Sequence, residues 1–213
     1  SLTVNDNDVQ PDKYGFFDTN VPVAPGGTSV RIVAVDRQGE RDEVWLELKP
    51  EDFNKPFFLS PKLARGIGEA GIFGGSISVP GSRIDERIVE FRRVHNLIQL
   101  VAVNSSFVVR DPKAPEARAV AASFAPSLLS STTVASQPHP ERKTVLVDAG
   151  PLFLNDMLGL GAALQRAYRQ GYALESRNTY FTTVRGGPDH LVLNVNAHFY
   201  TANIAAPQPG APT

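Results

Sequence analysis

Short runs of β-branched and aromatic residues, separated by prolines, glycines and polar turns, occupy most of the middle of the chain. Such runs are typical of β-strands. They predict strands at residues 30–35, 44–48, 57–59, 87–94, 97–103, 144–147 and 191–200. The last run alternates strictly, with Leu191, Leu193, Val195 and Ala197 on one face and Asn194, Asn196 and His198 on the other. This alternation indicates a sheet with one face in water, as antiparallel sheets commonly have.

The runs at 87–94 and 97–103 form the clearest pair of strands, because only His95 and Asn96 separate them. A two-residue hairpin loop favours positive φ at its central positions, and His and Asn tolerate that conformation better than most residues. We therefore expect an antiparallel hairpin that turns at these two residues.

Two other segments carry the three- and four-residue spacing of an amphipathic helix. The first, at about 112–125, begins at a proline after Asp111 or Ala114 and stops at Pro126. The second, at about 156–170, has Asn155 or Asp156 as its N-cap and Gly171 after its C-terminus. The apolar stripe of the first helix is Ala117, Val120, Ala121 and Phe124, and that of the second is Met157, Leu160, Gly161, Leu164 and Tyr168.

The order of these elements predicts an α+β fold, with a mainly antiparallel β-sheet and two principal helices, rather than a doubly wound parallel sheet. We expect an extended segment at 1–27, a single β-rich domain at 28–203 and a Pro-rich linker or tail at 204–213. The single methionine is internal, at position 157, so we expect the chain to be a piece of a longer protein.

Composition and charge exclude several classes of protein. The absence of cysteine excludes a disulfide scaffold, a zinc ribbon, a Cys nucleophile and an iron–sulfur site. Lys and Arg total 21 against 22 for Asp and Glu, and a net charge of -1 lacks the basic excess of a nucleic-acid-binding protein. No apolar run approaches the roughly 20 residues of a membrane-spanning helix, so we expect no transmembrane segment.

A Gly-rich loop at residues 66–75 begins with Gly66, Gly68 and Gly71 in the G-x-G-x-x-G spacing of dinucleotide-binding sites. In such a site the glycines open a helix whose N-terminus holds a pyrophosphate. Here the sequence continues Ile-Phe-Gly-Gly-Ser, which does not favour a helix. We therefore expect a flexible connection between strands, which could still serve as a contact surface.

The chain carries no recognisable metal-binding motif. None of His95, His139, His190 and His198 forms an HExxH pair, the helical spacing that sets two imidazoles around zinc. Residues 5–8, Asn-Asp-Asn-Asp, with Asp12 beyond them, resemble the start of a calcium loop. They lack the glycine at the sixth loop position and the closing glutamate of an EF-hand.

Candidate catalytic groups also have simpler interpretations. Neither Ser76 nor Ser82 lies in a G-x-S-x-G nucleophile elbow. Asp148 ends a predicted strand and is more typical of a residue that organises a turn. Asp85 and Glu86 lie among arginines, as on a solvated strand face. We assign no catalytic, cofactor-binding or metal-ligating residue.

Several segments in order resemble a known family. They are residues 42–59 (DEVWLELKPEDFNKPFFL), the Gly-rich loop, 87–101 (RIVEFRRVHNLIQLV), 111–129 (DPKAPEARAVAASFAPSLL) and 145–157 (VLVDAGPLFLNDM). This succession is similar to the uncharacterised region that precedes the catalytic domain in bacterial zinc-dependent metalloproteases of the Met-zincin kind. The resemblance implies an exported parent enzyme, periplasmic or at the cell envelope, whose zinc helix lies downstream. No functional residue can be transferred, because this chain has no matching zinc motif.

Three functional hypotheses follow. The first is a non-catalytic accessory domain that packs on, shields or helps to fold a downstream zinc-peptidase domain, with no cofactor in this chain. The second is a secreted binding module whose Gly-rich loop at 66–75 contacts a polysaccharide or a protein. The third is an enzyme whose site is built from residues far apart in the sequence. An exposed apolar patch away from the loop would favour the first, and an aromatic patch near the loop the second.

Overall fold

The computed structural model describes the side chains of residues 44–75, 86–186 and 190–202. It also describes the backbone of Glu43 and of strands β1 (Leu2–Val4), β2 (Asn7–Val9) and β3 (Arg31–Asp36). The predicted tail at 204–213, most of the predicted segment at 1–27, and Ser76, Ser82 and Asp85 lie outside the described residues. Every strand pair in the described part of the chain is antiparallel, which confirms a β-rich, mainly antiparallel fold.

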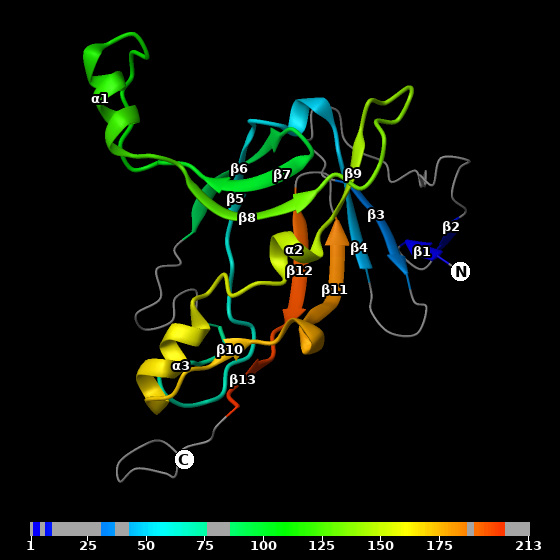
Figure 1. Cartoon of the computed structure of the whole chain (residues 1–213), viewed down its shortest axis with the longest axis vertical. Helices are drawn as coiled ribbons and strands as arrows, with labels where there is room; N and C mark the ends of the chain where they lie inside the picture. Colours follow the sequence, from blue (N-terminus) through cyan, green and yellow to red (C-terminus); the bar gives the residue numbers. More distant parts are fainter. Residues whose placement is uncertain are drawn as a thin grey trace.

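A four-stranded sheet is built on the predicted hairpin (Figure 1). Its order is β5 (Pro56–Leu59), β6 (Arg87–Val94), β7 (Leu97–Ala102) and β8 (Ser127–Thr133). His95 takes the positive φ of the turn, at 55°, as an exposed residue can at modest cost. The hairpin prediction is confirmed, but strand β8 was not predicted. Its sequence, SLLSSTT, is polar because most of its side chains are exposed.

A three-stranded sheet places β4 (Glu43–Leu48) between β3 and β9 (Val145–Asp148). Residues Val44, Leu46 and Leu48 of β4 are buried on one face, and Glu47 is buried as well. A strand buried on both faces is typical of a sheet interior. The predicted strands at 30–35, 44–48 and 144–147 are therefore confirmed, with ends shifted by a residue or two.

Three two-stranded ribbons complete the sheets in the described part of the chain, and the first pairs β1 with β2. The second pairs β11 (Tyr180–Gly186) with β12 (Leu191–Asn196), and the third pairs β10 (Ala173–Leu174) with β13 (Phe199–Tyr200). The predicted single strand at 191–200 is thus wrong, because the chain leaves the second ribbon after Asn196 to join the third. Within β12 the predicted alternation is confirmed, with the apolar side chains packed on the core and the asparagines exposed. Ala197 is exposed outside the strand.

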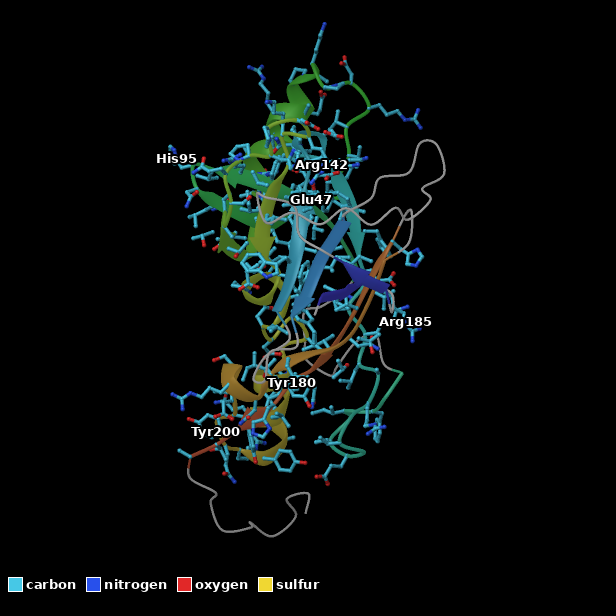
Figure 2. The ribbon with its side chains drawn as sticks, turned by 90° about the vertical axis from the view of Figure 1, so that its right-hand side faces the viewer. Glu47, His95, Arg142, Tyr180, Arg185 and Tyr200 are labelled. Atoms are coloured by element: carbon cyan, nitrogen blue, oxygen red, sulfur yellow. The ribbon has the colours of Figure 1, made fainter. Side chains whose placement is uncertain are left out.

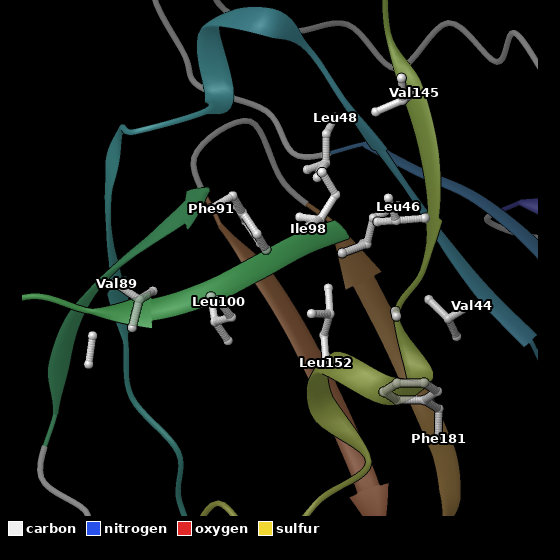
Figure 3. Packing of buried hydrophobic residues seen from close by; sticks show 13 residues of the cluster. Val44, Leu46, Leu48, Val89, Phe91, Ile98, Leu100, Val145, Leu152 and Phe181 are labelled. Atoms are coloured by element: carbon white, nitrogen blue, oxygen red, sulfur yellow. The ribbon is translucent and has the colours of Figure 1, made fainter. Parts of the chain in front are cut away.

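The main core lies where the two larger sheets and the β11–β12 ribbon meet (Figure 3). Leu152 of the short helix α2 (Gly150–Phe153) is fully buried there, together with Leu46, Leu100 and Phe181 from three different sheets. Ser130 Oγ of β8 donates a hydrogen bond of 2.9 Å to the Leu152 carbonyl. Helix α2 therefore joins the sheets at the centre of the molecule.

The two predicted helices exist but are shorter than expected. They are α1 (Pro115–Ser123) and α3 (Leu160–Tyr168), and two 3-10 turns lie at Pro50–Asp52 and Ser176–Asn178. Helix α1 has Ala114 as its N-cap with Pro115 in the first turn, as one of the two predicted starts requires. With α2, the described part of the chain has three short α-helices rather than two principal ones.

Both ends of α3 differ from the prediction. The N-cap is Gly159, although the carboxylate of Asp156 accepts hydrogen bonds from Leu160 N at 2.7 Å and Gly161 N at 2.9 Å. At the C-terminus, Arg169 takes the left-handed conformation with φ of 58°, instead of the predicted Gly171. The helix ends at Tyr168, two residues before the predicted end, because the chain turns at the left-handed Arg169. Tyr172 and Phe199 pack in the same apolar cluster as the helix.

Candidate interaction surface

Residues 103–126, between strands β7 and β8, leave the four-stranded sheet and form an arm that ends in helix α1 (Figure 1). The arm projects from one end of the molecule. No residue of α1 is buried, so the helix has no core of its own. The predicted apolar stripe of this helix is therefore not packed against the domain, contrary to what an amphipathic helix usually does.

The base of the arm is organised by Asn104. Its Oδ1 accepts hydrogen bonds from the backbone N–H of Ser106 at 3.1 Å and of Phe107 at 3.2 Å. Its Nδ2 donates to the Phe107 carbonyl at 2.9 Å. A side chain that satisfies neighbouring backbone groups in this way stabilises a turn. This turn fixes the position of Phe107.

Phe107 stacks on Phe124, with ring centroids 4.4 Å apart and an angle of 13° between the ring planes. The stack joins the two ends of the arm, since Phe124 follows directly after α1. Such a pair contributes roughly 0.5–1.5 kcal/mol beyond the area it buries. The stack therefore gives the arm a defined shape without contact to the main core.

The arm exposes an unusual amount of apolar surface. We call Phe107, Val108, Phe124 and Leu128 the arm patch; their exposed fractions are 55%, 78%, 38% and 57%. The first three lie on the arm, and Leu128 lies two residues beyond it, in β8. The charged side chains of the arm are all exposed, namely Arg110, Asp111, Lys113, Glu116 and Arg118. Apolar side chains grouped on a projecting element and bordered by charges are typical of a contact surface.

The Gly-rich loop at 66–75 is not the flexible connection that the sequence suggested. Gly75 N donates to the Leu63 carbonyl at 2.7 Å and closes the loop, and Ile72 is buried against Ala163 and Leu164 of α3. A Cβ on Gly66 would lie 2.1 Å from the Ile72 carbonyl oxygen, so the close approach requires glycine. Residues 66–75 form turns and bends and contain no helix.

The loop is also tied to α3 through polar groups. The Tyr168 hydroxyl donates a hydrogen bond to the Glu69 carboxylate. Burial and this neighbouring carboxylate raise the pKa of Tyr168 to about 12. On the outer side of the loop, Ile67 and Phe73 are exposed.

The histidines do not converge on one place. His95 forms the exposed hairpin turn, and His190 precedes β12. Buried His139 accepts hydrogen bonds at Nδ1 from the backbone N–H of Glu141 and Arg142, both at 3.2 Å. Across the described residues, no group of three or more His, Cys, Asp or Glu side chains could hold a metal ion.

The acidic residues considered as catalytic candidates make hydrogen bonds within the fold. Asp148 Oδ1 accepts a hydrogen bond of 2.8 Å from Gly150 N, which confirms its interpretation as a turn residue at the start of α2. Glu86 accepts one of 2.9 Å from Ser60 Oγ. Asn7 and Asp8 of the calcium-like segment lie in β2, and their side chains are outside the described residues.

A buried polar cluster was missed by the sequence analysis. Glu47 Oε1 accepts hydrogen bonds from Arg142 Nε at 2.9 Å and from Thr144 Oγ1 at 2.7 Å (Figure 2). The three residues join β4 to the turn before β9, which His139 holds in shape. Glu47 lies almost one hundred positions before Arg142 and Thr144, so their contact could not be predicted from local spacing. The single hint in the sequence was a charged residue, Glu47, within an apolar strand run.

The family of the chain follows from a match that covers more than half of its length. The model of DUF5117, a domain of unknown function, matches residues 81–206. The chain belongs to the DUF5117 family. The DUF5117 region includes the arm, helices α2 and α3, and strands β6 to β13, whereas β3, β4 and β5 precede it. The main core is therefore shared between the DUF5117 region and the residues before it.

Neither the curated proteins nor the solved structures gave a match to this DUF5117 chain. Its helices α1 and α3 have nine residues each, and no helix in the described part of the chain has the length and hydrophobicity needed to cross a membrane.

Proposed function

We propose that this DUF5117 chain is a non-catalytic accessory domain of a larger bacterial zinc-dependent metalloprotease, and that it docks on another part of that protein through the arm patch. The observation that carries the proposal is the exposed Phe107–Phe124 stack on an arm that projects away from the core. The order of motifs that resembles the region before the catalytic domain of Met-zincin metalloproteases supports the identity of the partner.

Burial of the arm patch against another domain would be favourable in free energy. The four apolar side chains of the arm patch are 38–78% exposed, and burying the exposed part would contribute roughly 1 kcal/mol per side chain. The Asn104 turn and the aromatic stack hold the patch in one shape, so little conformational entropy is lost on docking. A preformed apolar patch with a charged border therefore suits a stable contact between domains.

On this proposal, zinc and catalysis belong to the downstream peptidase domain. The parent is exported, to the periplasm or the cell envelope, and the chain packs on, shields or helps to fold the peptidase domain. Purified chain should then bind no stoichiometric zinc and hydrolyse neither casein nor a peptide library. Hydrolysis that a chelator abolishes would contradict the proposal.

Docking can be tested with the remainder of the parent protein. We expect the chain to associate with it in calorimetry, and the double variant F107S/V108S to bind at least tenfold more weakly. Phe58 of β5, 64% exposed and far from the arm in the sequence, supplies the matched control F58S, which should bind as the unmodified chain does. Equal binding by F107S/V108S would exclude the arm patch as the docking surface.

The second candidate function is a binding module that uses the Gly-rich loop. The observation in its favour is the exposure of Ile67 and Phe73 on a loop that Ile72 anchors to α3. The arm patch is larger and more apolar, which favours the first candidate. If I67S/F73S, rather than F107S/V108S, abolished association with the parent or with an added ligand, the second candidate would replace the first.

A further inference from the structure

A set of exposed polar and aromatic side chains lies near the α3 end of the molecule, away from the arm (Figure 1). It comes from two segments, the 3-10 turn that leads into β11 and the link between β12 and β13. We call it the Tyr180 platform, and its members are Glu175, Asn178, Tyr180, Asn196 and His198. Figure 2 labels Tyr180, and Tyr200 of β13 is another exposed ring of the chain.

The backbone beneath the platform is firmly held. Glu175 N donates to the His198 carbonyl at 2.8 Å. The buried hydroxyl of Thr179 donates to the Glu175 carbonyl at 2.8 Å and accepts from His198 N at 3.1 Å. Phe199, next in the chain, packs in the cluster of Ile72 and Leu164. The backbone that carries the platform is therefore held in place by main-chain contacts and by the Thr179 hydroxyl.

The side chains of the platform are fixed but remain accessible. Asn196 Nδ2 donates to the Tyr180 hydroxyl at 3.0 Å, across the β11–β12 pair, and Tyr180 is still 46% exposed. Asn178 Nδ2 donates to Glu175 Oε2 at 2.7 Å, and His198 Nε2 lies 3.5 Å from the same oxygen. Within the described part of the chain, these contacts do not use the amide oxygens of Asn178 and Asn196 or Glu175 Oε1, so these oxygens can accept hydrogen bonds from a ligand.

This combination of groups selects one class of ligand. An exposed aromatic ring offers an apolar face, while amides, an imidazole and a carboxylate offer acceptors and donors for hydroxyl groups. The single carboxylate is balanced by Arg177 of the same turn, so the surface does not attract phosphate or another strong anion. A pyranose has apolar C–H faces and a rim of hydroxyls, and it carries no charge.

We propose that the Tyr180 platform binds a neutral saccharide, which stacks on Tyr180 and exchanges hydroxyl hydrogen bonds with Glu175, Asn178 and Asn196. The site is separate from the arm patch and from the Gly-rich loop, so it does not depend on the docking proposed above. The proposal gives the domain a recognition role in addition to docking.

The test is affinity electrophoresis of the whole chain in native gels that contain amylose, xylan, laminarin, galactomannan or pullulan. We expect at least one polymer to retard the chain. Y180A should lose the retardation, and the control F58A, which removes a more exposed ring on β5, should keep it. Calorimetry with the hexasaccharide of that polymer should show at least tenfold weaker binding for Y180A.

A second variant keeps the test valid if Y180A fails to fold by circular dichroism. N178A removes an exposed amide and leaves the ring in place, and it should weaken binding severalfold without changing the thermal midpoint. The proposal is overturned if no polymer retards the unmodified chain, if folded Y180A or N178A binds as the unmodified chain does, or if F58A loses binding equally.

Discussion

Two Arg–Glu ion pairs with the same shortest N···O distance allow the effect of burial on stability to be measured in this chain. Arg142 Nε lies 2.9 Å from Glu47 Oε1, and Arg92 Nη2 lies 2.9 Å from Glu90 Oε2. Glu47 is 3% exposed, whereas Glu90 is 19% exposed. We predict that Arg142→Met lowers the free energy of unfolding much more than Arg92→Met does.

The size of each predicted loss in the free energy of unfolding depends on the groups that still contact the carboxylate once its arginine is removed. Without Arg142, Glu47 keeps the single hydroxyl of Thr144 on Oε1, and its buried Oε2 has no hydrogen-bond partner among the described residues. Breaking a buried ion pair typically costs about 3–5 kcal/mol. Arg142 itself is 32% exposed, so water offsets part of the loss, and we expect about 2–4 kcal/mol. For Arg92→Met, water replaces the guanidinium, and we expect below about 1 kcal/mol.

The assay is urea unfolding followed by the fluorescence of the single tryptophan, Trp45, which lies two residues before Glu47 in β4. The double variant Glu47→Gln with Arg142→Met removes the unpaired charge and should recover at least half of the loss. The reasoning is refuted if Arg142→Met costs no more than Arg92→Met. It is also refuted if the double variant is no more stable than Arg142→Met alone.

Three further predictions concern stability. Leu152→Ala, which empties a fully buried position between the sheets, should lower the free energy of unfolding by about 2–5 kcal/mol in the same assay, and a loss below about 1 kcal/mol would contradict its central role. Arg169→Gly should raise the thermal midpoint, because the left-handed conformation destabilises a residue other than glycine by about 1 kcal/mol. An unchanged midpoint would mean that contacts of the Arg169 side chain offset this strain. The pKa of Tyr168 is raised above its unfolded value of 10 to about 12, so its contribution is complete below pH 10 and is lost as the pH rises toward 12. Stability measured from pH 9 to 12 should therefore fall less steeply in Tyr168→Phe, and identical slopes would contradict the assignment.

The sequence predicted strands that have one apolar face, and also the continuous apolar run of β4, which is buried on both faces. The β6–β7 hairpin and the alternation of β12 were predictable because apolar and polar side chains meet different surroundings at every second residue. Strand β8 gave no such signal, because it lies at the edge of its sheet and most of its Ser and Thr residues are exposed. Strand β11, YFTTVRG, is rich in aromatic and β-branched residues and could have been predicted from them.

The contacts that tie distant segments together were beyond single-sequence reasoning. The pairing of Glu47 with Arg142, and of Glu69 with Tyr168, depends on which loops the fold brings together. Local spacing contains no information on such pairs. The Gly-rich loop illustrates the same limit, since its glycines indicated a turn but not that Ile72 would anchor it to α3.

The arm shows where helical periodicity is informative and where it is not. The spacing of Ala117, Val120, Ala121 and Phe124 correctly located α1, because it reports an apolar face. It does not report what that face packs against, and in this chain α1 stands away from the core with Phe107 stacked on Phe124. An apolar face that is not covered within its own domain lowers solubility unless something outside the domain covers it. For that reason the arm, rather than any cluster of titratable residues, is the place to look for the partner of this domain.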